Sequence, residues 1–215
     1  MIPLLHDFTG ETVLIFGGGP VGARKARRFA AEADAIVVSP DFADRAFGGA
    51  ERVREAPDAA GVREWVDRTD PALVVAATDD AELNAAAEAA AREAGALVNR
   101  ADDHGEQDAG NVVVPATVRD DPVVMAVATG GRSPALSKYL REAFEEQFAG
   151  AGAMAELTGD LREELKSADM TAAERRDAVR TVVRTREVWK ALDSGRSNAR
   201  QVAADVIGYQ MGDTS

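Results

Sequence analysis

Short apolar runs alternate with segments of helical periodicity through the first half of the chain. Residues 23–33 and 79–94 have the spacing of helices with one apolar face, and Gly95 lies just past the end of the second. Strands are predicted at Thr12–Phe16, Ile36–Val38, 51–57 (an edge strand), Leu73–Ala77 and 96–100. This alternation is typical of βαβ units. The expected fold class is α/β, with a Rossmann-type parallel sheet covered by helices on both faces.

The pattern changes after Gly110. Two apolar runs, Val112–Val118 and Val123–Ala128, are joined only by RDDP, which predicts a hairpin or meander. Ser133 and Pro134 then fit the N-cap and the first position of a helix. A strand-containing segment at 111–150 is therefore expected to follow a sheet domain at 1–110.

The last third of the chain is predicted to be helical. Thr171 and Glu174 have the spacing of a capping box and open one long helix through residue 192, with a shorter helix after it. Val183 and Trp189 are expected on the apolar face of the long helix. This helical domain is assigned to 151–215, and the least structured junction is expected at 149–157.

Composition narrows the class of protein. The chain has 215 residues and no cysteine. Its net charge of −12 argues against nucleic acid or an anionic membrane surface as partner. It has no run near the roughly 20 apolar residues of a membrane span, and its start lacks the pattern of a signal peptide. A cytoplasmic location is expected.

A glycine-rich loop, GGGPVG, stands between the first predicted strand and helix. Gly17, Gly19 and Gly22 fit G-x-G-x-x-G, in which the glycines allow a tight turn, close approach of a pyrophosphate and close packing of helix on strand. The helix N-terminus then stabilises the phosphate charge. The loop predicts a dinucleotide cofactor bound by Gly17, Gly18, Gly19, Pro20, Val21 and Gly22.

The ends of the next strands offer further contacts to such a cofactor. Asp41 follows the second strand and favours NAD, because an acidic residue there binds the ribose hydroxyls; capping a helix in FADRAF is the alternative. An arginine for the phosphate of NADP is not obvious, since Arg45 sits further along the loop. Thr78 is expected near the nicotinamide ribose, whereas Asp79 or Asp80 caps the helix after it. The predicted contacts beyond the glycine loop are Ser39, Asp41, Phe42, Thr78 and Asp79.

Several of these segments together resemble one family. LIFGGGPVGARKA, AATDD, NRADD and MAVATGGRSPALSKYLRE, in this order, are similar to precorrin-2 dehydrogenases. That family also forms the N-terminal half of fused siroheme synthases, and some members double as sirohydrochlorin ferrochelatase. The resemblance covers nearly the whole chain, and the methyltransferase half of the fused enzymes is not expected here, because the chain ends after its helices.

The resemblance implies NAD-dependent oxidation of precorrin-2 to sirohydrochlorin, with Fe²⁺ insertion as a second activity of some members. It implies a homodimer formed through 111–150 and a tetrapyrrole bound between domains. Asp102, in the Asn-x-x-Asp pattern that begins at Asn99, inherits the role of general base or acid. An unperturbed Asp has a pKa of about 3.9, and burial together with Asp103 would raise it. No metal site is expected, and His104 is expected to be inessential for dehydrogenation.

The substrate carries several carboxylates and requires a local basic cluster in an acidic protein. Arg132 in GGRSP is the strongest candidate, because a glycine-flanked arginine before a helix can bind a carboxylate with two hydrogen bonds. For Arg100, Arg119, Lys138 and Arg141, a surface ion pair is the alternative. The predicted substrate contacts are Thr129, Gly130, Gly131, Arg132, Ser133 and Lys138.

Two other functions remain open from the residues. A non-catalytic NAD(H)-sensing module would need neither Asp102 nor basic residues for a tetrapyrrole, and tetrapyrrole binding separates it from the enzyme. An oxidoreductase for another substrate has less support, since Lys138 and Tyr139 are adjacent and do not form a Tyr-x-x-x-Lys pair.

Overall fold

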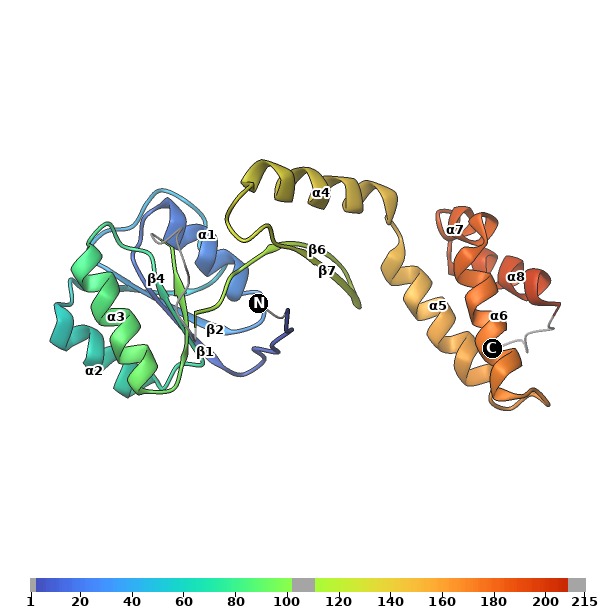
Figure 1. The fold of residues 1–215 in the computed structure, drawn as a ribbon, viewed down its shortest axis with the longest axis horizontal. Coiled ribbons are helices and arrows are strands. Elements are labelled where there is room, and N and C mark those ends of the chain that lie inside the picture. The colour runs from blue at the N-terminus through green and yellow to red at the C-terminus, as the bar shows by residue number, and fades with distance from the viewer. Residues whose placement is uncertain (1–2, 102–110, 209–215) are drawn as a thin grey trace. The chain divides into compact units, whose positions relative to one another are not determined.

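The computed structural model describes residues 3–101 and 111–208 of the chain. Figure 1 shows its fold, coloured by residue number. The chain divides into two compact units, residues 1–114 and 115–215. Asp102, Asp103 and His104 lie outside the described residues. Within the described ranges, no helix is both long enough and apolar enough to cross a membrane.

The first unit is built on a parallel sheet in the order β3-β2-β1-β4-β5. Its strands are β1 (Thr12–Phe16), β2 (Asp34–Ser39), β3 (Glu51–Arg54), β4 (Leu73–Ala76) and β5 (Leu97–Arg100). Its helices are α1 (Pro20–Phe29), α2 (Ala59–Thr69) and α3 (Ala81–Glu93). At the end of central strand β1, Phe16 pairs with Val38 on one side and Ala76 on the other. The predicted α/β class and Rossmann-type sheet are confirmed.

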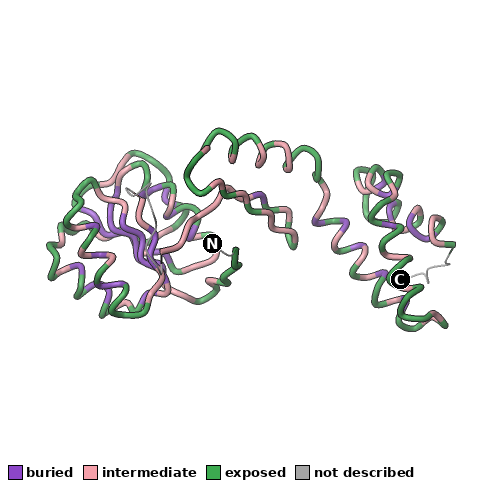
Figure 2. Tube along the Cα trace, in the orientation of Figure 1, coloured by how far each residue is buried: buried purple, intermediate pink, exposed green. Residues whose placement is uncertain are grey.

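Side chains alternate between two buried faces of this sheet, whose strands are largely purple in Figure 2. Val13 and Ile15 of β1 pack on the side of α1, whereas Leu14 and Phe16 pack on the side of α2 and α3. Every residue of β4 is buried. A sheet packed on both faces gives the loops at its carboxyl edge a rigid base.

Helix α2 is not predicted from the sequence. Its side chain cap is Asp58, which accepts a hydrogen bond of 2.9 Å from the Gly61 N–H. Val62, Trp65 and Val66 form its buried face. Only these three apolar residues mark the helical period, so the signal is weak until the sheet provides a surface for them.

The second unit begins with an antiparallel hairpin of β6 (Ala116–Asp120) and β7 (Val123–Val127), followed by α4 (Pro134–Gln147). The expected strand at Val112–Val118 is wrong in its first half. Asn111 instead forms a parallel bridge with Val98, and the Val112 N–H donates to the Val98 carbonyl at 2.7 Å. Pairing with β5 therefore determines the conformation before Pro115, and the hairpin begins after it.

Four helices complete the second unit: α5 (Ala151–Glu164), α6 (Ala172–Arg184), α7 (Arg186–Leu192) and α8 (Arg196–Ile207). The loose junction expected at 149–157 is wrong, because α5 begins at Ala151 and buries Met154, Leu157 and Leu161. The expected single helix 171–192 is interrupted at Thr185, which has extended backbone angles. The capping box of Thr171 and Glu174 is confirmed, but Val183 is exposed rather than on the apolar face.

Candidate functional site

The outer glycines of the loop are required by packing. Gly17 has a φ of +114°, and a Cβ there would lie 2.4 Å from the Ala77 carbonyl oxygen. A Cβ on Gly22 would lie 1.8 Å from the Gly17 carbonyl oxygen. The loop is therefore held tightly between the end of β1, the end of β4 and the start of α1, and only glycine fits at these two positions.

Gly19 has a different reason to be glycine. Its φ of −71° suits any residue, and a Cβ there would meet nothing within 4 Å. It is the N-cap of α1, and no side chain caps this helix end within the described residues. The open space beside uncapped N–H groups fits a pyrophosphate, whose charge the helix N-terminus stabilises. Pro20 and Val21, in the first turn of α1, are exposed at this same end.

The loop after β2 lies directly against the glycine loop. The Ala43 N–H donates to the Gly18 carbonyl at 2.8 Å, and a Cβ on Gly18 would lie 2.2 Å from the Asp41 carbonyl oxygen. Residues 41–50 contain no helix, so the alternative in which Asp41 caps one is wrong. Ser39, the last residue of β2, is buried. The predicted contacts at the ends of β1 and β2 are thus adjacent.

Two arginines at this edge were not expected from the sequence. Arg54 Nη1 lies 2.8 Å from Asp41 Oδ1 and donates to the Pro40 carbonyl at 2.8 Å. Both Arg52 and Arg54 place their guanidinium groups 5.7 Å from the centre of the Phe42 ring. The signal available in the sequence was their spacing of two in the edge strand, which puts both side chains on one face.

At the end of β4, Thr78 belongs to a local hydrogen-bond network. Its hydroxyl lies 2.7 Å from Asn84 Oδ1, and Asn84 Nδ2 donates to the Thr78 carbonyl at 3.0 Å. Asn84 is buried in α3 and was not among the predicted residues. Asp80 is the cap of α3, accepting from the Glu82 and Leu83 N–H groups, whereas Asp79 is exposed. Asp79 is therefore available to a ligand, and the Thr78 backbone is held in place by Asn84.

A hydrogen bond from Lys25 links α1 to β5. Its ammonium donates to Asn99 Oδ1 at 2.7 Å, and Asn99 Nδ2 donates to the Val112 carbonyl at 2.7 Å. Burial lowers the pKa of Lys25 from 10.5 to about 8, with smaller contributions from Arg24 and Arg28. Asn99 and Val112 lie on either side of residues 102–110, so this chain of bonds ties the two flanks together.

Arg100 forms an ion pair rather than an open basic site. Its guanidinium lies 2.8 Å from the Glu88 carboxylate, and both side chains are less than one fifth exposed. Glu88 also pairs with Arg92 at 2.7 Å and accepts from Asn111 Nδ2 at 3.3 Å. This network supports the ion-pair alternative for Arg100.

In the second unit, the predicted substrate residues surround the N-terminus of α4. Gly130 and Gly131 have φ values of +61° and +76°, and the Ser133 hydroxyl accepts from the Leu136 N–H as N-cap. The Thr129 hydroxyl lies 3.0 Å from that of Ser137. Arg132 is exposed, and its side chain makes no ion pair with any described residue.

The other basic residues of α4 have acidic neighbours either one turn or one residue further along the helix. Lys138 lies 3.8 Å from Glu142, and Arg141 pairs with both Glu142 and Glu145. Such pairs at helical spacing stabilise the helix surface. They leave Arg132 as the strongest candidate of this group for a carboxylate ligand.

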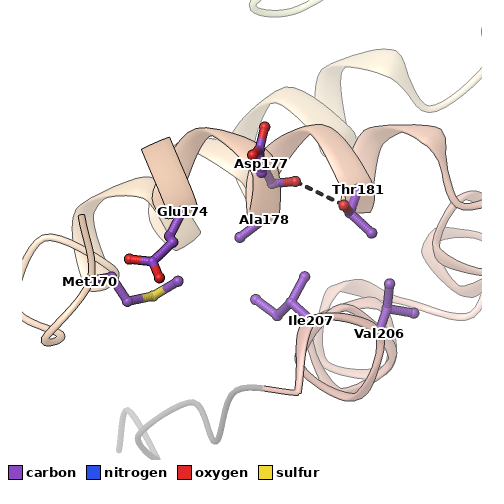
Figure 3. A pocket seen from close by; sticks show the side chains of 7 residues that line it. All are labelled: Met170, Glu174, Asp177, Ala178, Thr181, Val206 and Ile207. Atoms are coloured by element: carbon purple, nitrogen blue, oxygen red, sulfur yellow. Dashed lines mark hydrogen bonds between the residues drawn. The ribbon is translucent and has the colours of Figure 1, made fainter. Parts of the chain in front are cut away.

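A shallow groove lies between α6 and α8 (Figure 3). Its volume is about 370 Å³, and it is lined by Met170, Glu174, Asp177, Ala178, Thr181, Val206 and Ile207. Glu174 is engaged in the capping box, which lowers its pKa through hydrogen bonds from Thr171. The carboxylates of Glu174 and Asp177 make this groove unsuitable for a ligand that itself carries carboxylates.

The Rossmann sheet and the open glycine loop define a dinucleotide-binding protein. A family model described as putative NAD(P)-binding matches residues 4–116. The chain is 32% identical to a precorrin-2 dehydrogenase of Methanosarcina barkeri, over 96% of this chain and 93% of that protein. The chain belongs to the precorrin-2 dehydrogenase family, whose members are oxidoreductases of siroheme biosynthesis. The NAD(P)-binding family model and the precorrin-2 dehydrogenase relative confirm the predicted nicotinamide dinucleotide cofactor.

Two further similarities agree with this assignment. Siroheme synthase 2 of Aeromonas hydrophila is 36% identical over 81% of this chain, which spans only 36% of that longer protein. The solved structure of SirC, precorrin-2 dehydrogenase, has a TM-score of 0.61 and 20% identity, covering 97% of this chain and all of that one. The latter shows a shared fold.

Proposed function

We propose that this protein oxidises precorrin-2 to sirohydrochlorin with NAD as the cofactor. The observation that carries the proposal is the 32% identity to a precorrin-2 dehydrogenase over nearly the whole of both chains. The open space at Gly19, beside the uncapped start of α1, supports binding of the dinucleotide.

Each part of the carboxyl edge has a distinct task in this proposal. The glycine loop binds the pyrophosphate, Asp41 and Phe42 bind the adenosine end, and Thr78 and Asp79 lie near the nicotinamide ribose. Bound NAD supplies the hydride acceptor. Asp102 takes the proton that the macrocycle loses, so that one hydride and one proton leave precorrin-2. The backbone that leads to Asp102 is anchored by the bonds among Lys25, Asn99 and Val112.

The substrate carboxylates are assigned to the segment around the start of α4. Arg132 supplies the charge, and the Thr129–Ser133 turn and its glycines supply backbone N–H groups. Lys138 is a weaker contributor, because Glu142 lies 3.8 Å away.

A homodimer formed through residues 111–150 completes the proposal. A two-stranded sheet is marginally stable by itself. Helix α4 has no buried residue in the described structure, and Leu136 and Tyr139 are 46% and 66% exposed. These apolar side chains and the hairpin are the surface that a second copy would cover. Light scattering at working salt tests the assignment, and a monomer would contradict it.

The test of the reaction is a coupled assay with precorrin-2 and NAD, in which NADH and sirohydrochlorin are followed together. Asp102→Asn should retain NAD affinity and lose about 10²–10⁴ in turnover, the usual contribution of a general acid or base. Near-normal turnover would make Asp102 a simple loop carboxylate. Binding of NAD without any binding of a tetrapyrrole would favour the sensing module.

Iron insertion is a second candidate activity, supported by the relatives that are named siroheme synthases. Supplied sirohydrochlorin and Fe²⁺ should yield siroheme above the non-enzymatic rate. We expect His104→Ala to lower that rate modestly and Asp102→Ala to lower it more. No rate above background would restrict the protein to dehydrogenation. The cytoplasmic location stays a prediction.

A further inference from the structure

A pocket of about 470 Å³ lies beside the glycine loop, at the carboxyl ends of β2 and β3. It is lined by Phe42, Ala43, Asp44, Arg52 and Arg54. The hydrogen bond from Ala43 to Gly18 places its rim against the predicted pyrophosphate site. In Rossmann folds, the adenosine ribose lies beyond the second strand, next to the glycine loop. The pocket is therefore in position to receive the 2′ end of the cofactor.

The charges around this pocket have opposite preferences. Asp41 has a side chain that is 91% exposed, so its carboxylate is available to the ribose hydroxyls. Arg54 is paired with that carboxylate at 2.8 Å. Arg52 contacts the rings of Phe42 and Phe47 and makes no ion pair with any residue in the described ranges. A carboxylate repels a 2′-phosphate, whereas two guanidinium groups attract it.

We propose that Arg52 and Arg54 form a 2′-phosphate site, which the Asp41 carboxylate masks through its pairing with Arg54. The inference rests on the proposed binding of a dinucleotide and adds the determinant of its choice. Asp41 accepts hydrogen bonds from the ribose hydroxyls while Arg54 orients the carboxylate. A 2′-phosphate would have to displace Asp41 from Arg54 and remain close to it, which disfavours NADP.

Removing the carboxylate should expose the masked site. In Asp41→Ser, both guanidinium groups become available to phosphate, while NAD loses its acceptor. A hydrogen bond to a charged group corresponds to roughly 10- to 100-fold in affinity. Titration calorimetry should show NAD binding weaker and NADP binding stronger by factors in this range, so that the preference reverses. In the double variant with Arg54→Gln, the gain for NADP should be largely lost.

The single variants separate orientation from direct contact. Arg54→Gln alone should weaken NAD by less than tenfold, since the carboxylate remains but is no longer oriented. Arg52→Gln should reduce the NADP affinity gained in Asp41→Ser. The matched control is the exposed pair Arg63 and Glu93, which links α2 to the end of α3. Glu93 precedes β5 and lies at the opposite edge of the sheet, so Glu93→Ser and Arg63→Gln should leave both affinities unchanged.

The outcomes distinguish the two proposals. A wild type that binds neither NAD nor NADP overturns the proposed function itself. A wild type that binds NAD, with an Asp41→Ser variant that gains no affinity for NADP, overturns only the masked phosphate site. Wild-type affinity for NADP equal to that for NAD would likewise contradict the selective role of Asp41.

Discussion

The carboxyl edge of the Rossmann sheet and the start of α4 were both predicted to bind ligand, but they are built differently. At the sheet edge, backbone geometry forms the site. A Cβ on Gly17 or Gly22 would lie less than 2.5 Å from a backbone oxygen, whereas a Cβ on Gly19 would meet no atom within 4 Å. Around α4, the exposed side chain of Arg132 carries the proposed charge, and the second basic candidate, Lys138, has Glu142 as an acidic neighbour. Sites made by backbone are readable from glycine spacing, whereas sites made by charges depend on which partners the fold brings near.

Substitutions in the glycine loop should have the largest effects. Gly19→Asp should keep the fold, because the space there is open, but place a charge against the pyrophosphate. Like-charge contact costs several kcal/mol, or more than roughly 10²-fold in NAD affinity. Calorimetric titration measures it, and unchanged affinity would remove the loop from the cofactor site.

Gly22→Ala is the contrasting variant of the same loop. Its Cβ would lie 1.8 Å from the Gly17 carbonyl oxygen, so the loop must shift, at about 1–3 kcal/mol of stability. Thermal unfolding should separate it from Gly19→Asp, which should unfold like the wild type.

The side-chain site should respond more weakly. Arg132→Ala should raise the KM for precorrin-2 by about tenfold and leave kcat nearly unchanged, because the lost hydrogen bond binds substrate and transition state alike. Arg180→Ala, which removes an exposed arginine paired with Asp177, is the control and should change neither. An unaltered KM in Arg132→Ala would place the substrate carboxylates elsewhere.

Lys25 provides a test by pH in the sheet unit. Its pKa of about 8 in the folded state lies below the usual value of 10.5, so between these pH values the unfolded chain binds a proton that the native state lacks. The free energy of unfolding should therefore rise with pH through this window, by up to about 1.4 kcal/mol per pH unit. Lys25→Met should remove this rise, and exposed Lys166→Met should retain it. If the free energy of unfolding changed with pH in the same way for the wild type and for Lys25→Met, the lowered pKa of Lys25 would be contradicted.

The smallest expected effect separates two neighbouring acids. Asp80→Ala should lower the free energy of unfolding by about 1 kcal/mol, because the cap accepts two backbone N–H groups of α3. Asp79→Ala should change stability by less than about 0.5 kcal/mol, since that residue is exposed. Equal losses in urea unfolding would reverse the assignment of the cap.

Local signals in the sequence were reliable where one segment contains both partners. The capping box joins Thr171 to Glu174, and the N-cap Ser133 accepts from the Leu136 N–H. In both cases the two partners are only three positions apart in the sequence. Helix α2 was missed because its few apolar residues become informative only against the sheet, and the strand expected from Val112 began later because Asn111 and Val112 pair with β5.

The sequence by itself determined the alternation of strands and helices and the glycine loop, because periodicity and steric limits act over a few neighbouring residues. The tertiary structure alone decided which charges meet. Asp41 and Arg54 are 13 residues apart, and Lys25 and Asn99 are 74 apart. Parallel pairing of β2 with β3 puts the first pair at one edge, and packing of α1 near β5 joins the second. Such contacts depend on chain crossovers, which leave no local period in the sequence.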